Sequence, residues 1–215
     1  MKICGLTEPA DARRAAAAGA EFLGVVLVSG TPRALTPQQA RRVVAGLEAS
    51  VVAVVADLET ARVVEAAKHI GASVLQLHGE ESLAEIARLR EQGPWEIWKA
   101  LSVRKVEEVL QGVDAYAGVV DGILLDGWHP RQRGGTGATF AWKDVAEVRG
   151  RFPDGIRLVA AGGLNPGIVE EAVRVLKPHV VDVSSGVESA PGIKSAEKVN
   201  EFIQNARRAG KRRSQ

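Results

Sequence analysis

Two residues suited to proton transfer stand at the ends of apolar segments that are far apart in the sequence. Cys4, the only cysteine of the chain, follows Lys2-Ile3, and Asp126 follows Ile123–Leu125. A thiolate can remove a proton from carbon and a carboxylic acid can donate one, so this pair could move protons without a metal or cofactor. A lone cysteine more often packs as a small hydrophobe, and an aspartate at a strand end can cap a turn. Isomerisation is therefore the expected reaction class if the fold brings both residues to one pocket.

Two later segments end in small residues that let an anion approach the backbone. Leu158–Asn165 contains Gly162-Gly163, and Val181–Val187 contains Ser184-Ser185-Gly186. Backbone N–H groups at such turns can bind phosphate, although glycines also serve simply to make tight turns. Because two successive apolar segments end in this way, we predict a phosphate site at Gly163, Ser184, Ser185 and Gly186. The expected partner is a phosphorylated small molecule.

Three further features bear on ligand binding. Arg33 could offer its planar guanidinium to a substrate carboxylate, although a solvated loop arginine is the simpler interpretation. His78 follows Leu77 and is expected to form hydrogen bonds within the rim of the site. The other histidines lie elsewhere in the pattern, so we predict neither a metal site nor a cofactor. The glycine-rich segment 134–137 is expected to be a mobile loop that closes over the ligand.

The elements that must position these residues alternate along the chain. The predicted strands are mostly continuous apolar runs, which is typical of parallel strands buried on both faces. They are Lys2–Cys4, Phe22–Val28, Val51–Ala56, Val74–Leu77, Ile97–Leu101, Gly122–Leu125, Arg157–Ala160 and Val180–Val183. The predicted helices are Glu8–Ala18, Pro37–Leu47, Glu59–Ile70, Glu80–Gln92, Val103–Leu110, Trp142–Phe152, Pro166–Leu176 and Ser195–Arg208.

This alternation predicts the fold class, an α/β (β/α)8 TIM barrel with a parallel eight-stranded sheet. An open doubly wound sheet is the alternative, but the first turn, Cys4–Thr7, lacks the glycine pattern of a dinucleotide site. Functional residues of such barrels lie at the carboxyl ends of the strands. Cys4 and Asp126 would then face a common pocket from opposite sides of the barrel.

Length and composition fit one domain without targeting or membrane segments. We expect a catalytic barrel over residues 1–206 and a frayed basic tail over residues 207–215. The net charge of +2 hides this tail, which contains Arg207, Arg208, Lys211, Arg212 and Arg213. A basic end of this kind can bind nucleic acid but is more often a solvated terminus, so we expect no nucleic-acid or membrane partner. A single cysteine and the absence of a long apolar run favour a cytoplasmic protein.

These segments taken together resemble the phosphoribosylanthranilate isomerase family, from residue 2 to about residue 203. The resemblance implies a barrel enzyme of tryptophan biosynthesis, and its motifs occur in the family's order. The matching stretches are Lys2–Thr7, Thr31–Arg33, Gln76–Glu80, Leu124–Asp126, Gly134–Phe140, Ala161–Pro166, Val181–Glu188 and Pro191–Lys194. The chain departs from the family pattern at Ala141, where an acidic residue is usual, and in the loop Trp128–Arg133.

Carried over by position, the resemblance implies roles for individual residues. Cys4 would be the general base and Asp126 the general acid of an Amadori rearrangement of N-(5-phosphoribosyl)anthranilate. Arg33 would hold the anthranilate carboxylate, and Asp182 would touch the sugar hydroxyls. The phosphate would be bound by the glycine and serine residues named above.

Two alternatives remain open from the sequence. Another phosphosugar barrel enzyme would need catalytic lysine and glutamate at strand ends, or several metal ligands, and neither set is evident. A non-catalytic phosphate-binding barrel would keep the fold without turnover. The chain could be a monomer or a homodimer.

Overall fold

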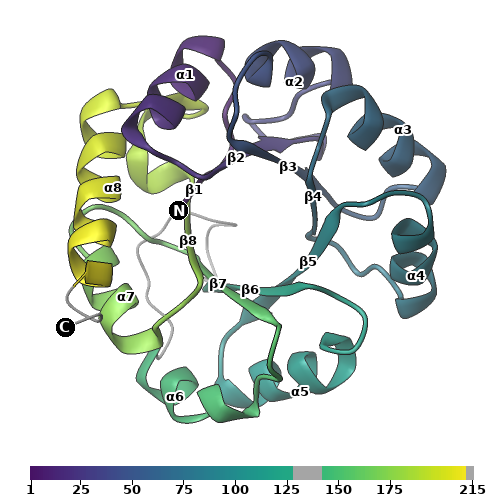
Figure 1. The fold of residues 1–215 in the computed structure, drawn as a ribbon, viewed down its shortest axis with the longest axis vertical. Coiled ribbons are helices and arrows are strands. Elements are labelled where there is room, and N and C mark those ends of the chain that lie inside the picture. The colour runs from purple at the N-terminus through teal and green to yellow at the C-terminus, as the bar shows by residue number, and fades with distance from the viewer. Residues whose placement is uncertain (128–141, 212–215) are drawn as a thin grey trace.

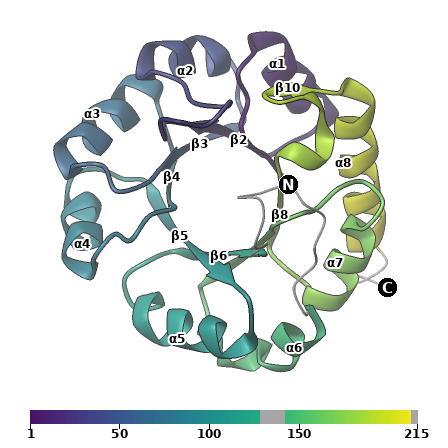
Figure 2. The ribbon, with the colours of Figure 1, turned by 180° about the vertical axis from the view of Figure 1, so that it is seen from behind.

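The predicted (β/α)8 barrel is confirmed by a computed structural model that describes residues 1–127 and 142–211. In these residues eight parallel strands form one closed barrel, in the order in which they occur along the chain. Helices surround the strands as an outer ring (Figures 1 and 2). The closing seam joins β8 to β1, where Lys2 is paired with Asp182 and Ile3 with Val183.

The strands and helices lie close to their predicted positions. The barrel strands are β1 Lys2–Ile3, β2 Phe22–Val26, β3 Ser50–Val55, β4 Val74–Leu77, β5 Glu96–Val103, β6 Gly122–Gly127, β7 Arg157–Ala161 and β8 Val180–Val183. The helices are α1 Pro9–Ala18, α2 Pro37–Val44, α3 Thr60–Ile70, α4 Leu83–Glu91, α5 Val106–Tyr116, α6 Trp142–Glu147, α7 Val169–Leu176 and α8 Ala196–Lys211. Short 3₁₀ helices occupy Arg149–Arg151 (η1) and Ser185–Val187 (η2).

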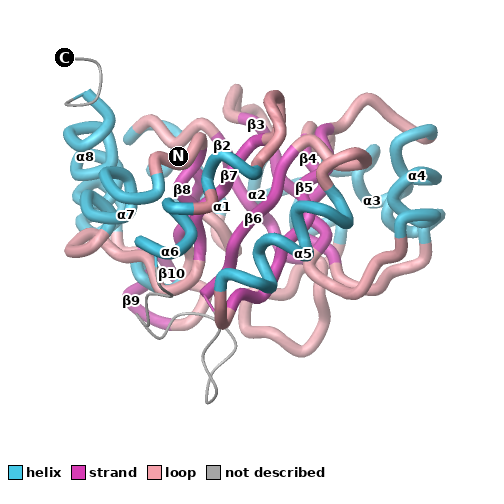
Figure 3. The backbone as a smooth tube through the Cα atoms, turned by 90° about the horizontal axis from the view of Figure 1, so that it is seen from below, coloured by secondary structure: helices cyan, strands magenta, loops and turns pink. Residues whose placement is uncertain are grey.

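The fifth strand, the fifth helix and one small sheet show the clearest differences from prediction. The fifth helix was expected from Val103, but β5 continues to that residue and α5 begins at Val106. An antiparallel pair, β9 Glu188–Ala190 and β10 Ile193–Lys194, follows β8 and was not predicted. Figure 3 shows this pair at the edge of the barrel away from the N-terminus, which is the edge where β8 ends.

The basic tail, expected to be frayed from residue 207, is helical in its described part. Helix α8 continues to Lys211 because its basic residues have partners. Arg207 Nη2 donates a hydrogen bond to the Gly19 carbonyl at 3.2 Å, and the Arg208 guanidinium pairs with the Glu170 carboxylate. Arg212 and Arg213 lie outside the described residues. No helix in the described part of the chain is long and apolar enough to cross a membrane.

The interior of the barrel has its own apolar cluster, separate from the layer between strands and helices. Trp98 of β5 is fully buried there and meets the Phe22 ring edge-on, with 5.0 Å between ring centroids. Its Nε1 donates to Glu96 Oε2 at 3.0 Å, so the indole is fixed at both ends. The neighbouring strand accommodates the ring because it has glycine at position 122. A methyl group there would lie 2.7 Å from Trp98 Cδ1.

We therefore expect Gly122→Ala to destabilise the barrel. Overpacking a close-packed interior costs about 1–3 kcal/mol, so the free energy of unfolding in urea should fall by that amount. Gly118→Ala is the matched control, since no atom lies within 4 Å of a methyl group at that exposed position. Equal stability of the two variants would contradict the packing argument.

Candidate active site

Cys4 lies directly after β1, above a buried ion pair. Its backbone N–H donates to the Val183 carbonyl at 2.8 Å, which holds the residue against the end of β8. Lys2 stands two positions earlier, so its side chain points to the same face of the strand. Lys2 is fully buried, and its Nζ donates to Asp182 Oδ2 at 2.7 Å. A cation therefore lies inside the barrel on the same side of β1 as the thiol.

Gly24 of β2 provides the space that Cys4 and Lys2 occupy. A methyl group at Gly24 would lie 2.8 Å from Cys4 Sγ and 3.1 Å from Lys2 Cε. The sulfur and the lysine stem thus border the same point of the barrel wall. Any larger residue at position 24 would displace the thiol.

Burial and nearby charges act in opposite directions on the Cys4 thiol. Burial raises its pKa, the Lys2 ammonium lowers it, and Asp182 raises it again, so that the net shift is upward. Burial lowers the pKa of Lys2, but Asp182 and Cys4 raise it by more, which keeps Lys2 charged. The substrate-free protein consequently holds Cys4 as the thiol at neutral pH, with a cation placed to stabilise the thiolate when it forms.

Asp126 and His78 approach one another from β6 and the end of β4. His78 Nε2 lies 3.4 Å from Asp126 Oδ2, and both side chains are partly exposed. Gln76 Nε2 lies 3.1 Å from His78 Nδ1. His78 therefore lies between the Gln76 amide and the Asp126 carboxylate, with one ring nitrogen toward each.

The backbone around Asp126 is close to that of β7. Gly162 has φ of +79°, and a methyl group there would lie 2.0 Å from the Gly127 nitrogen and 2.7 Å from Asp126 Oδ1. Only glycine combines this left-handed conformation with such an approach. The Gly162-Gly163 turn therefore fixes the end of β7 against the aspartate.

A second buried ion pair secures the strand end that carries His78. Lys99 Nζ donates to Glu81 Oε2 at 3.0 Å, and Glu81 accepts from the backbone N–H groups of Gly79 and Asp57. Asp57 in turn accepts from the Glu80 N–H at 2.6 Å. Asp57 thus stabilises the loops after β3 and β4, in contrast to the strand-end residues that face the barrel interior.

The predicted phosphate segments meet at the mouth of the barrel. Gly163 follows β7, Ser184 follows β8, and Ser185-Gly186 begins the η2 turn. A methyl group at Gly186 would lie 1.9 Å from the Leu164 carbonyl oxygen, so the two loops are in contact. The loop that carries Gly163 and the loop that carries Ser184, Ser185 and Gly186 are therefore in contact at the end of the barrel.

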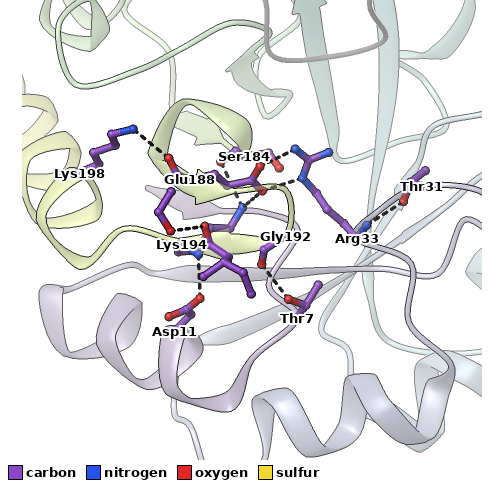
Figure 4. Close-up of polar contacts among 11 residues, drawn as sticks. Thr7, Asp11, Thr31, Arg33, Ser184, Glu188, Gly192, Lys194 and Lys198 are labelled. Carbon is purple, nitrogen blue, oxygen red and sulfur yellow. Dashed lines mark hydrogen bonds and ion pairs between the residues drawn. The ribbon is translucent and has the colours of Figure 1, made fainter.

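Arg33 reaches the same region and has a partner that the sequence analysis did not identify. Its side chain lies over Gly5, where a methyl group would be 2.4 Å from Arg33 Cδ and 2.9 Å from Ser184 Oγ. Arg33 Nε and Nη2 donate to Glu188 Oε1 and Oε2, each at 2.7 Å. The arginine is thus paired with an internal carboxylate (Figure 4).

Sequence patterns did not identify three charged residues of this region: Lys2, Glu188 and Lys194. Lys2 could have been placed beside the thiol, because a residue two positions before Cys4 on a strand points to the same face. Glu188 and Lys194 belong to motifs noted in the sequence, but their contacts depend on β9 and β10. In the described residues no three histidine, cysteine or carboxylate side chains converge to hold a metal. The segment 134–137 and the loop Trp128–Arg133 lie outside the described residues.

Known proteins resemble this chain over nearly its whole length. The family model described as N-(5'phosphoribosyl)anthranilate (PRA) isomerase matches residues 1–205. N-(5'-phosphoribosyl)anthranilate isomerase from Trichlorobacter lovleyi is 41% identical over 211 residues, covering 97% of this chain and 98% of that protein. The relative of the same name from Geobacter sp. strain M21 is 40% identical, covering 97% of this chain and 98% of the relative.

Solved structures agree with these matches. Phosphoribosyl anthranilate isomerase from Thermotoga maritima has a TM-score of 0.88 and 35% identity, covering 96% of this chain and 97% of that one. A phosphoribosyl anthranilate isomerase in complex with reduced 1-(o-carboxyphenylamino)-1-deoxyribulose 5-phosphate has a TM-score of 0.84 and 32% identity, with coverage of 96% and 97%.

The electrostatics of Cys4 can be tested by titrating the thiol. Because burial raises the pKa, the thiolate absorbance, taken as the difference from Cys4→Ser, should appear above the usual pH for cysteine. A raised folded-state pKa also means that this group's contribution to stability is lost as the pH rises through it. Lys2→Met should move the midpoint further upward, because it removes the cation that favours the thiolate. Lys68→Met, an exposed helical change, is the control, and an unshifted midpoint in Lys2→Met would exclude the interaction.

Proposed function

The chain belongs to the N-(5'-phosphoribosyl)anthranilate isomerase family, whose members are isomerases of tryptophan biosynthesis, and from this premise we propose its reaction and the residues that perform it. The reaction is the Amadori rearrangement of N-(5-phosphoribosyl)anthranilate to 1-(2-carboxyphenylamino)-1-deoxyribulose 5-phosphate. One observation carries the assignment of residues. Cys4 and Asp126 stand at the same end of one closed barrel, and each occupies a position whose side chain points into the barrel.

Asp126 is the general acid in this proposal. It gives its proton to the ribose ring oxygen, the bond from that oxygen to C1′ breaks, and the anthranilate nitrogen forms a Schiff base with C1′. His78 Nε2 lies 3.4 Å from Asp126 Oδ2, close enough to stabilise the charge of the carboxylate that remains. His78 also borders the sugar from the rim of the pocket.

Cys4 is the general base of the second step. As the thiolate it removes the proton from C2′, the Schiff base accepts the electron pair, and the resulting enolamine relaxes to the ketone. The Lys2 ammonium supports this role because it stabilises the charged form of a thiol that burial disfavours. The chemistry requires no metal and no cofactor.

Residues at the end of the barrel bind the phosphate and the sugar of the substrate in this proposal. Gly163, Ser184, Ser185 and Gly186 bind the phosphate, since their two loops are in contact and are glycine-rich. Asp182 touches the sugar hydroxyls in this proposal, as the resemblance implies, and its Oδ1 has no hydrogen-bond partner among the described residues.

Turnover of phosphoribosylanthranilate tests the catalytic assignment. We expect Cys4→Ser and Asp126→Asn each to lower kcat by about 10²–10⁴-fold, the range for removing a positioned acid or base. Both variants should still bind the reduced product analogue, because neither change removes an anion-binding group.

Asp154→Asn, at an exposed loop position, is the control and should retain the rate of the unmodified protein. Rates near that level in both folded active-site variants would refute their assigned roles. No turnover by the unmodified protein would favour a non-catalytic phosphate-binding barrel or a different phosphosugar substrate.

The pH profile tests the required charge state of Cys4. If the thiolate is the base, kcat/KM should rise with pH and level off only above the raised pKa of the thiol. The residual activity of Cys4→Ser should lack this limb, because a hydroxyl does not ionise in that range. An unchanged limb in Cys4→Ser would indicate another base.

A further inference from the structure

The carboxylate of Glu188 is the centre of a buried charge cluster beside the proposed site. Besides its two bonds from Arg33, it accepts a bond from Lys194 Nζ at 2.8 Å. The side chains of Glu188 and Lys194 are only 7% and 1% exposed, so these interactions are shielded from water. Burial raises the pKa of Glu188, but Arg33 and Lys194 together lower it by more, and the group stays charged at neutral pH.

The cluster is rigid because the backbone on both sides of Glu188 is anchored. The Glu188 carbonyl accepts from Lys198 Nζ at 2.9 Å, and the Lys194 N–H donates to the buried Asp11 carboxylate at 2.8 Å. Thr7 Oγ1 donates to the Gly192 carbonyl at 2.7 Å between β9 and β10. Figure 4 shows the Arg33 and Lys194 side chains approaching the same carboxylate from separate segments.

Among the described residues, only one edge of the Arg33 guanidinium is bound, and Glu188 is its partner. It engages Nε and Nη2, which use two of the five N–H groups of an arginine. The remaining edge, formed by Nη1 and the second hydrogen of Nη2, is the one that a second carboxylate can bind with two parallel bonds. Two cations share one anion in this cluster, so a further negative charge would balance it.

We propose that Glu188 is a positioning residue. Held in place by Lys194, it fixes the Arg33 guanidinium so that the Nη1 edge of Arg33 binds the carboxylate of the substrate. This inference rests on the proposed function and on the role that the resemblance implies for Arg33, which is to hold the anthranilate carboxylate. Glu188 therefore contributes to discrimination between a carboxylated arylamine and one without the carboxyl group. It touches Arg33 and takes no part in proton transfer.

A pair of stable ligands separates this role from a general structural one. The first is the reduced product analogue, reduced 1-(o-carboxyphenylamino)-1-deoxyribulose 5-phosphate, and the second is the same compound without its carboxyl group. Calorimetric Kd values for both ligands should be measured with the unmodified protein, Glu188→Gln and Arg33→Met. The exposed Glu197→Gln is the matched control.

We expect Glu188→Gln to weaken binding of the carboxylated ligand by about 10- to 100-fold, the range for losing hydrogen bonds to a charged group. Its Kd for the ligand without the carboxyl group should stay within about threefold, because that ligand does not use Arg33. Arg33→Met should lose the same preference. A parallel loss for both ligands in Glu188→Gln, or no change for either, would overturn the proposal.

A second variant and a second comparison distinguish failure of this inference from failure of the proposed function. If Glu188→Gln does not fold, Glu188→Asp keeps the charge but withdraws the carboxylate by one methylene, and it should lose part of the preference without affecting the second ligand. Equal binding of both ligands by the unmodified protein would overturn this inference even if the protein turns over phosphoribosylanthranilate. Failure of turnover together with a preserved preference would instead contradict the proposed function.

Discussion

The ion pair between Lys2 and Asp182 is the constraint on which both the closure of the barrel and the placement of the thiol depend. The two residues are register partners across the seam between β8 and β1, which is only two residue pairs long. Burying two charges is costly, and removing one partner of such a pair destabilises a protein by about 3–5 kcal/mol. A slip of one residue at the seam would turn Lys2 and Cys4 away from the barrel interior together. One interaction therefore sets the register and orients the thiol.

Lys2 and Asp182 are two of five charged groups that lie near the end of the barrel where the strands finish. Lys2 is neutralised by Asp182, whereas Glu188 is shared by Arg33 and Lys194. The five groups carry one more positive than negative charge. In an interior shielded from water, such an excess favours an anionic ligand more strongly than the same charges on the surface would. The electrostatics thus agree with a substrate that carries a phosphate and a carboxylate.

Much of this arrangement could be predicted from local sequence patterns. Continuous apolar runs predicted the strands, and the residues that follow those runs included Cys4 and Asp126. Both predictions depend only on residues that are neighbours in the sequence. The strand β5 was underestimated because its last residues, Ser102 and Val103, precede a charged segment that resembles a helix start. β9 and β10 are three and two residues long, too short for any periodicity to show.

Pairings between distant residues could not be predicted in this way. Arg33 and Glu188 are 155 positions apart, and nothing near either residue identifies its partner. Lys2 was overlooked for a related reason: a lysine is expected at the surface unless a counter-ion is known, and its counter-ion lies 180 positions away. Such contacts follow from the closure of the barrel, which brings the first and last strands together.

The contacts of Lys194 link the two anion-binding parts of the proposed site. Its Nζ donates to the Ser184 carbonyl at 3.1 Å as well as to Glu188, so one ammonium group joins the phosphate loop to the partner of Arg33. The side chain is almost fully buried and has little freedom to move. The spacing between the proposed phosphate and carboxylate sites is therefore set by the protein before a ligand arrives. A preformed spacing of this kind selects ligands by the length of the chain between their two anionic groups, which neither site could do alone.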